Sequence, residues 1–356
     1  MRRAVPLLIA AFLLASACVG GAAPRESAQP GPVGGTPAAP TAAASDPPQA
    51  PIKVRASYSV VTGAVAPLWL ALDHGLWARH GLDVDLSLIS GTPTSMAALL
   101  TGETQFSQTA GDSSLSMQAK EPDVIAILNT SVASAHRMMV PEAIRTVEDL
   151  RGKRMGVFTL GDGNYALISK ALLKFGFNPD RDVIWTPVGG GNMGGLAAAL
   201  SAGAIDGALL TPPSDLPALK AGAKVLFELQ DLDLPSAGLP VYTLRRTLDS
   251  QRAVAEAYAA GIVDGVRMFK TDPAAGKEAL ARWAGLTDAE AIDHTYEAYS
   301  GRRMAERPFL DVEQTRQVLE ILAIDQPDLR SIPLERVLDN SVLETLDRRG
   351  LLPPKS

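Results

Sequence analysis

Residues 97–102 read AALLTG and residues 198–203 read AALSAG, and each run closes a helical pattern at a glycine before the next strand pattern begins. They occupy corresponding places in a longer order of strand and helix patterns, which runs from Ile52 to Leu128 and again from Arg154 to Leu229. Strand–helix–strand units build mostly parallel sheets with helices on both faces. The repeat therefore predicts an α/β protein with two similar lobes; one long doubly wound sheet is the alternative.

The lobe boundaries are expected where the chain passes from one repeat to the other. We place these links near residues 138–142 and 240–244. Lobe one then comprises residues 51–140 and 240–356, and lobe two comprises residues 141–239. The chain after Leu248 has mainly helical patterns. We expect this helical C-terminal segment to pack mainly on lobe one.

The first 18 residues are typical of a signal peptide. Arg2 and Arg3 precede an apolar stretch, residues 5–14, that is too short to span a bilayer as an ordinary helix. The following Ala15-Ser16-Ala17-Cys18 resembles a bacterial lipobox, although the usual leucine is displaced by one position. Lipidation of Cys18 would anchor the protein to a membrane. An ordinary cleaved signal with an incidental cysteine is the alternative.

Residues 19–50 form a segment of low sequence complexity, rich in Ala, Pro, Gly and Ser and without aromatic side chains. Such a segment cannot bury enough apolar surface to offset the entropy lost on ordering. We therefore interpret it as a disordered tether. After a lipid anchor, a tether would let the folded part move above the membrane surface.

The charges and cysteines exclude several kinds of partner and site. The formal net charge is −6, so the chain lacks the basic character typical of a nucleic-acid-binding protein. Cys18 is the single cysteine, which excludes an internal disulfide and a cysteine-based zinc site. The four histidines are scattered, and we interpret them as surface or capping residues. No metal and no cofactor are expected.

A ligand site is expected where the strands end. In open α/β sheets, ligands bind beyond the carboxyl ends of the strands. In both lobes these ends lead into short loops rich in Gly, Ser and Thr, and then into helix N-termini, whose free N–H groups attract anions. The candidate ligand-binding residues are Tyr58, Ser59, Thr62, Thr92, Thr109 and Asp112 in lobe one, and Thr159, Gly161, Asn164, Gly190, Asn192 and Thr211 in lobe two.

Some of these residues also have a purely structural interpretation. Tyr58 ends a strand and is as readily explained by core packing. Asp112 is better explained as a cap or turn residue, and Asp215 as an N-cap. Thr109 and Thr211 end corresponding strands, and for each we leave ligand contact and a structural role equally open. Since the cleft loops lack Arg and Lys, they favour a small polar or weakly anionic organic molecule.

Several stretches resemble the NMT1/THI5-like family, which includes binding proteins for aliphatic sulfonates, taurine, nitrate and thiamine precursors. The stretches that carry the resemblance are APLWLA at 66–71, HGLW at 74–77, GLDV at 81–84, LLTGE at 99–103, DLRGKRMGV at 149–157 and ALSAGAIDGA at 199–208. The resemblance covers residues 52–244, and the helical tail more weakly. It implies a type II periplasmic-binding-protein fold that closes around its ligand by a hinge.

The resemblance also implies a function: a monomeric, extracytoplasmic solute-binding protein that delivers its ligand to the permease and ATPase of an ABC importer. Enzymes of this superfamily use cysteine, which the predicted folded region lacks, so we expect no enzyme. A GxGxxG motif at Gly189, Gly191 and Gly194 does not predict a dinucleotide site, because Asp206 begins the next strand and so lies at its wrong edge. A ligand sensor for a receptor and an extracytoplasmic enzyme on the same fold remain alternatives.

Overall fold

The computed structural model describes residues 50–131, 133–160, 163–188, 192–232, 234–323 and 326–354. The predicted signal peptide, Cys18 and nearly all of the predicted tether lie outside the described residues. Residues 48–356 form one compact unit. In the described part of this unit, every helix is too short or too polar to cross a membrane.

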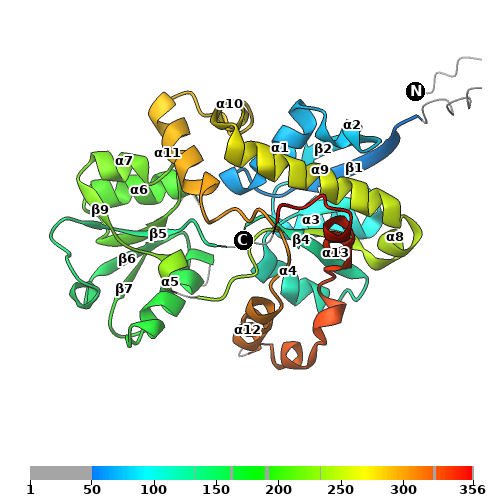
Figure 1. Ribbon diagram of the computed structural model, residues 1–356. Coiled ribbons are helices and arrows are strands. Elements are labelled where there is room, and N and C mark those ends of the chain that lie inside the picture. Colours follow the sequence, from blue (N-terminus) through cyan, green and yellow to red (C-terminus); the bar gives the residue numbers. More distant parts are fainter. Residues whose placement is uncertain are drawn as a thin grey trace, which may run out of the picture. The chain divides into compact units, whose positions relative to one another are not determined.

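The unit contains two sheets, and their strand orders correspond (Figure 1). The first sheet has the order β2-β1-β3-β10-β4 and the second the order β7-β6-β8-β5-β9. The strands of the first are β1 (Ile52–Tyr58), β2 (Leu82–Leu88), β3 (Phe106–Gln108), β4 (Val124–Asn129) and β10 (Pro240–Leu244). Those of the second are β5 (Arg137–Pro141), β6 (Arg154–Val157), β7 (Ile184–Pro187), β8 (Gly207–Leu210) and β9 (Ala223–Glu228). The repeat seen in the sequence is thus a repeat of sheet topology.

The chain crosses between the sheets twice. β5 follows the first crossing and joins the second sheet, and β10 follows the second crossing and joins the first sheet. β5 pairs antiparallel with β8 and β9, and β10 pairs antiparallel with β3 and β4. The predicted links near 138–142 and 240–244 are therefore largely strands, and the crossings are residues 130–136 and 229–239. The lobe boundary expected after residue 140 falls inside β5, whose buried Met138, Met139 and Val140 pack in the second lobe.

Helices cover the faces of both sheets. Those of the first repeat are η1 (Gly63–Val65), α1 (Ala66–Asp73), α2 (Leu76–Arg79), α3 (Thr92–Thr101) and α4 (Gly111–Gln118). Those of the second are η2 (Glu148–Leu150), α5 (Gly163–Lys174), α6 (Met193–Ser201), α7 (Leu216–Lys220) and η3 (Leu229–Asp231). The C-terminal segment contributes α8 (Arg245–Ser250), α9 (Arg252–Thr271), α10 (Pro273–Trp283), α11 (Ala289–Ser300), α12 (Val312–Leu322), η4 (Pro327–Ser331), η5 (Leu334–Arg336) and α13 (Ser341–Arg348).

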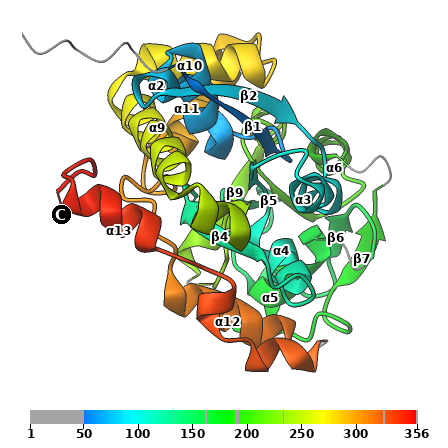
Figure 2. The same cartoon turned by 90° about the vertical axis from the view of Figure 1, so that its right-hand side faces the viewer.

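The largest hydrophobic cluster joins the first sheet to the C-terminal helix α9, which lies beside α2 in both views (Figure 1 and Figure 2). The Tyr258 ring of α9 stacks on Phe106 of β3 at 4.2 Å and on Trp77 of α2 at 5.1 Å. α10 packs on α1, and α13 packs on α9 and β4. These contacts confirm that the C-terminal segment packs on lobe one. α11 differs, because it also contacts lobe two.

Candidate functional site

Three of the predicted residues in lobe one form a chain of hydroxyl groups, which we call the hydroxyl chain. Ser59 follows β1, Thr92 begins α3 and Thr109 follows β3. Ser59 Oγ donates to Thr109 Oγ1 at 2.7 Å, and Thr109 Oγ1 donates to Thr92 Oγ1 at 2.9 Å. The three residues therefore meet at the carboxyl edge of the first sheet, where the topology rule places a ligand.

The hydroxyl chain ends at Thr92, the most accessible of its three members. Each hydroxyl donates to the next one, so Thr92 keeps its own proton for an acceptor, and no such acceptor lies among the described residues. Thr92 is also the first residue of α3; Pro93 has no N–H, but the N–H groups of Thr92 and Thr94 lie in the first turn, where a helix provides no acceptor. This end of the chain can therefore donate to a polar or anionic group.

Buried hydrogen bonds connect the hydroxyl chain to both crossings. Ser59 N–H donates to Gln108 O at 3.0 Å, which keeps the loops after β1 and β3 together. The Gln108 side chain donates from Nε2 to Thr130 Oγ1 at 2.7 Å and to Leu239 O at 3.0 Å. Thr130 and Leu239 belong to the first and second crossings. The edge of the first sheet is thus fixed directly to both connections between the lobes.

The other predicted residues of lobe one have different surroundings. Tyr58 is buried and packs edge-on against Trp69 at 6.0 Å, as the core interpretation requires. The hydroxyl of Thr62 is hydrogen-bonded to that of Tyr299 in α11 at 2.7 Å. Asp112 Oδ1 accepts from the N–H of Ala237, in the second crossing, at 2.7 Å. Asp112 therefore does not cap its own helix, and the N–H of Ala237 occupies its Oδ1.

Asp112 also makes an ion pair between the lobes. Its Oδ2 lies 4.0 Å from Nζ of Lys170, which belongs to α5 of the second lobe. Burial raises the pKa of Asp112, and the N–H of Ala237 and the charge of Lys170 oppose this only in part. Lys170 further lines a small pocket of about 110 Å³ between α5, α12 and both crossings. The prediction that the cleft loops lack Arg and Lys is correct for the loops, but a helix supplies a cation here.

The predicted residues of lobe two have different surroundings, and the structure describes four of the six. Asn164 is buried and donates to Leu209 O of β8 at 3.2 Å. Asn192 caps α6 by accepting from Gly195 N–H at 2.9 Å. Thr159 is exposed, and Thr211 is partly buried after β8. Gly161 and Gly190 lie outside the described residues, so most of this half of the predicted site remains a prediction.

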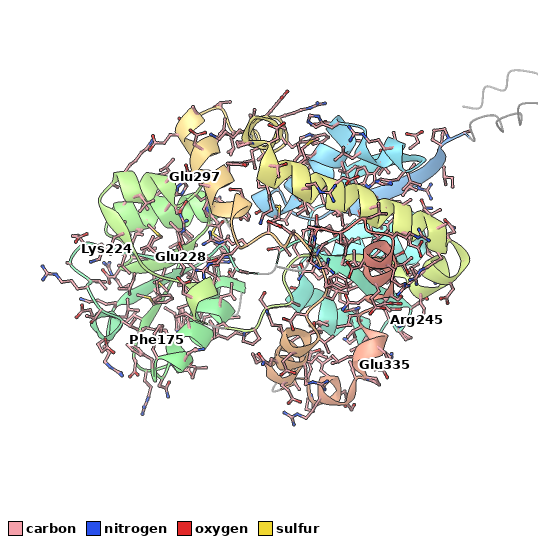
Figure 3. The ribbon with its side chains drawn as sticks, viewed as in Figure 1. Phe175, Lys224, Glu228, Arg245, Glu297 and Glu335 are labelled. Carbon is pink, nitrogen blue, oxygen red and sulfur yellow. The ribbon has the colours of Figure 1, made fainter. Side chains whose placement is uncertain are left out.

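A cluster of charged residues that the sequence did not reveal lies beside the second sheet; we call it the ionic network. Asp215, which is completely buried, accepts from Arg137 Nη1 at 2.6 Å and from His294 Nε2 at 2.9 Å. Arg137 Nε donates to Glu228 at 3.0 Å, and Arg303 donates to the same carboxylate at 2.5 Å. Glu228, labelled in Figure 3, ends β9.

The ionic network stabilises a buried negative charge. Burial opposes the charged form of Asp215, but the hydrogen bond and charge from His294, followed by those from Arg137, lower its pKa below the ordinary value. Asp215 stands at the N-cap position of α7, yet its side chain makes no capping hydrogen bond, so the expected cap is not formed. No local pattern signals the contact with His294, which is 79 residues away. Among the described residues, no group of three or more His, Cys, Asp and Glu side chains could hold a metal ion.

Comparisons with known proteins bear on the family and the fold of the chain. Residues 63–275 match the model of a family described as NMT1/THI5 like. A protein of Brucella abortus (strain 2308), named as a binding protein, is 32% identical over 127 residues, which are 34% of this chain and 39% of the relative. The chain thus spans about two fifths of that relative's length.

Solved structures share the fold. The periplasmic aliphatic sulphonate-binding protein SsuA from Escherichia coli is 19% identical and covers 80% of this chain and 91% of its own, with a TM-score of 0.68. The desulfurization enzyme DSZB is 15% identical and covers 83% of this chain and 99% of its own, with a TM-score of 0.62. A gene product of Candida albicans with the generic periplasmic-binding-protein fold has a TM-score of 0.57 at 14% identity, covering 85% of this chain and 98% of its own. The predicted periplasmic-binding-protein fold is confirmed.

Proposed function

Because this chain belongs to the NMT1/THI5-like family, we propose that it is a solute-binding protein, which captures a small organic molecule between two hinged lobes and delivers it to an ABC importer. The hydroxyl chain carries this proposal. Three hydroxyl groups from separate loops converge at one sheet edge. The last of them, on the accessible Thr92, still has a proton to donate. A second set of linked hydroxyls, from Ser57, Ser95 and Ser107, is completely buried in the same lobe. The hydroxyl chain differs from it in having an accessible end at Thr92, where a polar ligand can bind.

The donors at this edge favour an acceptor-rich ligand. The hydroxyl of Thr92 and the N–H groups at the start of α3 offer protons at this edge. Lys170, in α5 beside Asp112, is a positive charge on the second lobe. We infer a small organic anion, and a sulfonate is one candidate because the protein from Escherichia coli described above is named for that class. Asp112 beside Lys170 limits the net positive charge, which favours a singly charged solute over a multiply charged one.

We further propose that the protein works outside the cytoplasm on a lipid anchor at Cys18, as a monomer. The apolar stretch before the small residues of 15–17 and the cysteine supports this, together with the low-complexity segment that follows. Two acyl chains would hold the protein at the membrane surface without a spanning helix. The proposed partners are the permease and the ATPase of the importer.

An enzyme is the second candidate, because DSZB has the same fold. The chemistry available here differs from that of the cysteine-using enzymes, since Cys18 is the only cysteine and lies in the predicted signal peptide. We therefore propose binding without turnover. Incubation of the purified protein with a bound solute, followed by mass spectrometry, checks this; a converted solute would establish the enzyme instead.

A thermal-shift and calorimetry screen tests the binding function. The panel contains alkanesulfonates, taurine, nitrate, pyrimidines and aromatic acids. A true ligand at 100 times its Kd stabilises the folded state by about 2.7 kcal/mol, which raises the Tm by several degrees. If no member of these classes raises the Tm or gives heat of binding, the proposed ligand class is wrong.

Matched variants then connect the binding to the hydroxyl chain. Thr109→Val removes the central hydroxyl and is expected to weaken binding by about tenfold or more, because Ser59 and Thr92 both lose a partner. Thr104→Val is the control, since Thr104 lies before the same strand at its other end and its buried hydroxyl has no partner in the described structure. Equal affinities of the two variants would place the solute elsewhere.

A further inference from the structure

Helix α11 contacts the second lobe through the first part of its length. His294 Nε2 donates to Asp215 Oδ1 at 2.9 Å, and Lys220 of α7 lies 2.6 Å from Glu290. Asp215 is completely buried and also held by Arg137, so it is a rigid anchor. It belongs to the loop between β8 and α7, which is a carboxyl-edge loop of the second sheet. The family match ends at residue 275, before this helix begins.

The same helix contacts the first lobe one turn and a half later. Tyr299, buried with 4% of its surface exposed, shares a hydrogen bond of 2.7 Å with the hydroxyl of Thr62. The next residue, Gly63, lies so close that a Cβ there would be 2.4 Å from the Tyr299 ring. The loop after β1, a carboxyl-edge loop of the first sheet, is therefore packed directly on α11.

The two contacts fix a distance between the lobes. His294 and Tyr299 are five residues apart on one helix, which corresponds to about 7.5 Å along its axis. Their partners, Asp215 and Thr62, belong to carboxyl-edge loops of opposite sheets. A single helix thus spans the two loops that the fold would present to a solute.

The segment that follows α11 is bound to lobe two and to the first crossing. Arg303 donates to Glu228 of β9 at 2.5 Å and to Ser134 O of the first crossing at 3.3 Å. Ala305 N–H donates to Thr130 O, also in the first crossing, at 3.1 Å. Figure 1 shows α11 between α10 and the helices α6 and α7. The helix thus contacts lobe two through His294 and lobe one through Tyr299, and the segment after it is tied to the first crossing. Movement of one lobe relative to the other must therefore break at least one of these contacts or carry the helix with one lobe.

We propose that α11 is a strut that sets the spacing of the two solute-binding loops, with His294 and Tyr299 as positioning residues. The claim that these loops bind a solute rests on the proposed function, but the spacing itself does not. Because α11 keeps the loops of Thr62 and Asp215 together, the lobes would separate where Asp112 of α4 and Lys170 of α5 face each other. The solute would then enter between α4 and α5, past that ion pair.

Spin-label distance measurements on the full chain test the strut without any ligand. Ala97→Cys on α3 and Leu173→Cys on α5 place labels at exposed positions of the two lobes, in a Cys18→Ser background. His294→Leu and Tyr299→Phe each remove one contact, and we expect both to shift or broaden the distance distribution between the labels. His294→Gln, which retains a donor for Asp215, is expected to restore it.

His80→Leu is the matched control. His80, directly after α2, pairs with Asp264 of α9 at the same 2.9 Å, within the first lobe. Its side chain is about as exposed as that of His294, at 23% against 19%, although Asp264 is less buried than Asp215. It is expected to leave the distribution between the lobes unchanged. If His294→Leu and Tyr299→Phe give the wild-type distribution, the strut is refuted.

Affinity measurements with an alkanesulfonate found in the screen then test the positioning role. His294→Leu and Tyr299→Phe are each expected to lose about fivefold in affinity, which corresponds to the loss of one hydrogen bond. His80→Leu is expected to keep the affinity of the wild type. Changed distances with unchanged affinity would overturn positioning. If no solute binds the wild type, the proposed function fails, while changed distances still support the strut.

Discussion

The protonation of His136 is linked to the stability of the fold. It lies in the first crossing, where its Nδ1 is 2.9 Å from Ser134 Oγ, and burial lowers its pKa to about 4. A histidine in an unfolded chain titrates near 6.5. Between these pH values the unfolded chain binds a proton that the folded protein does not. The contribution of His136 to the free energy of unfolding therefore falls as the pH is lowered from about 6.5 to about 4.

His136→Asn is expected to reduce this pH dependence. The shift corresponds to at most about 3 kcal/mol, and to less where water reaches the ring. Urea denaturation at several pH values from 7.5 to 4 measures the free energy of unfolding of both proteins. The variant should lose less stability over this range than the wild type. His74→Asn, at an exposed position, should behave as the wild type; parallel curves for His136→Asn and wild type would contradict the prediction.

Some contacts between side chains could be predicted from the sequence, and others could not. Ser59, Thr92 and Thr109 could be predicted to meet, because parallel strands bring their carboxyl ends to one edge. The contacts Asp215–His294 and Thr62–Tyr299 could not, since they join residues 79 and 237 positions apart through tertiary packing. Lys170 was missed because it belongs to the body of a helix, where a lysine is normally a solvated surface residue.

At the scale of elements, the two crossings are packed against each other. Asn129 at the end of β4 accepts from Ser131 N–H at 3.2 Å and from Leu239 N–H at 3.1 Å, and it donates to Ala237 O at 3.1 Å. Gly238 has a positive φ of 66°, and a Cβ there would lie 2.1 Å from Ser131 O. The two crossings are therefore closely packed against each other, and the side chain of Asn129 is hydrogen-bonded to both.

Gly238→Ala is expected to disrupt this pair of segments. The left-handed backbone alone costs an alanine roughly 1–2 kcal/mol, and the clash with Ser131 O adds to it, so we expect a loss of about 3 kcal/mol or more. Gly81→Ala is the matched control, because its φ is 77° and no atom lies within 4 Å of the added Cβ. Chemical denaturation compares the two. Equal losses would mean that the crossings can separate without cost.

The same crossings explain why the lobe boundary was the weakest part of the sequence interpretation. Met138, Met139 and Val140 are fully buried, and β10 is likewise buried along its length. A short apolar run of this kind is compatible with a strand of either lobe, because periodicity says nothing about which sheet it joins. Antiparallel insertion of β5 and β10 is a property of the topology, and only the structure of the whole chain determines it.

At the scale of the whole molecule, the lobes are joined at several places of different strength. The crossings and α11 use buried groups, whereas the Asp112–Lys170 pair is longer and partly exposed, with 32% and 20% of the two side chains accessible. An ion pair of this kind contributes at most about 1 kcal/mol. Since weak contacts break first, opening is expected to separate α4 from α5 while α11 remains bound.

The solute should reverse this opening by stabilising the closed form, because a ligand shifts a conformational equilibrium only by the difference between its affinities for the two states. Small-angle scattering with saturating solute is therefore expected to give a smaller radius of gyration than without it. Identical scattering profiles with and without solute would mean that the lobes do not close on it.

The charge of Lys170 is tested by its replacement. Lys170→Met should weaken binding by up to about fivefold if Lys170 only pairs with Asp112, and by much more if it also contacts the solute's charge. Lys174→Met, one turn further along α5, is the control.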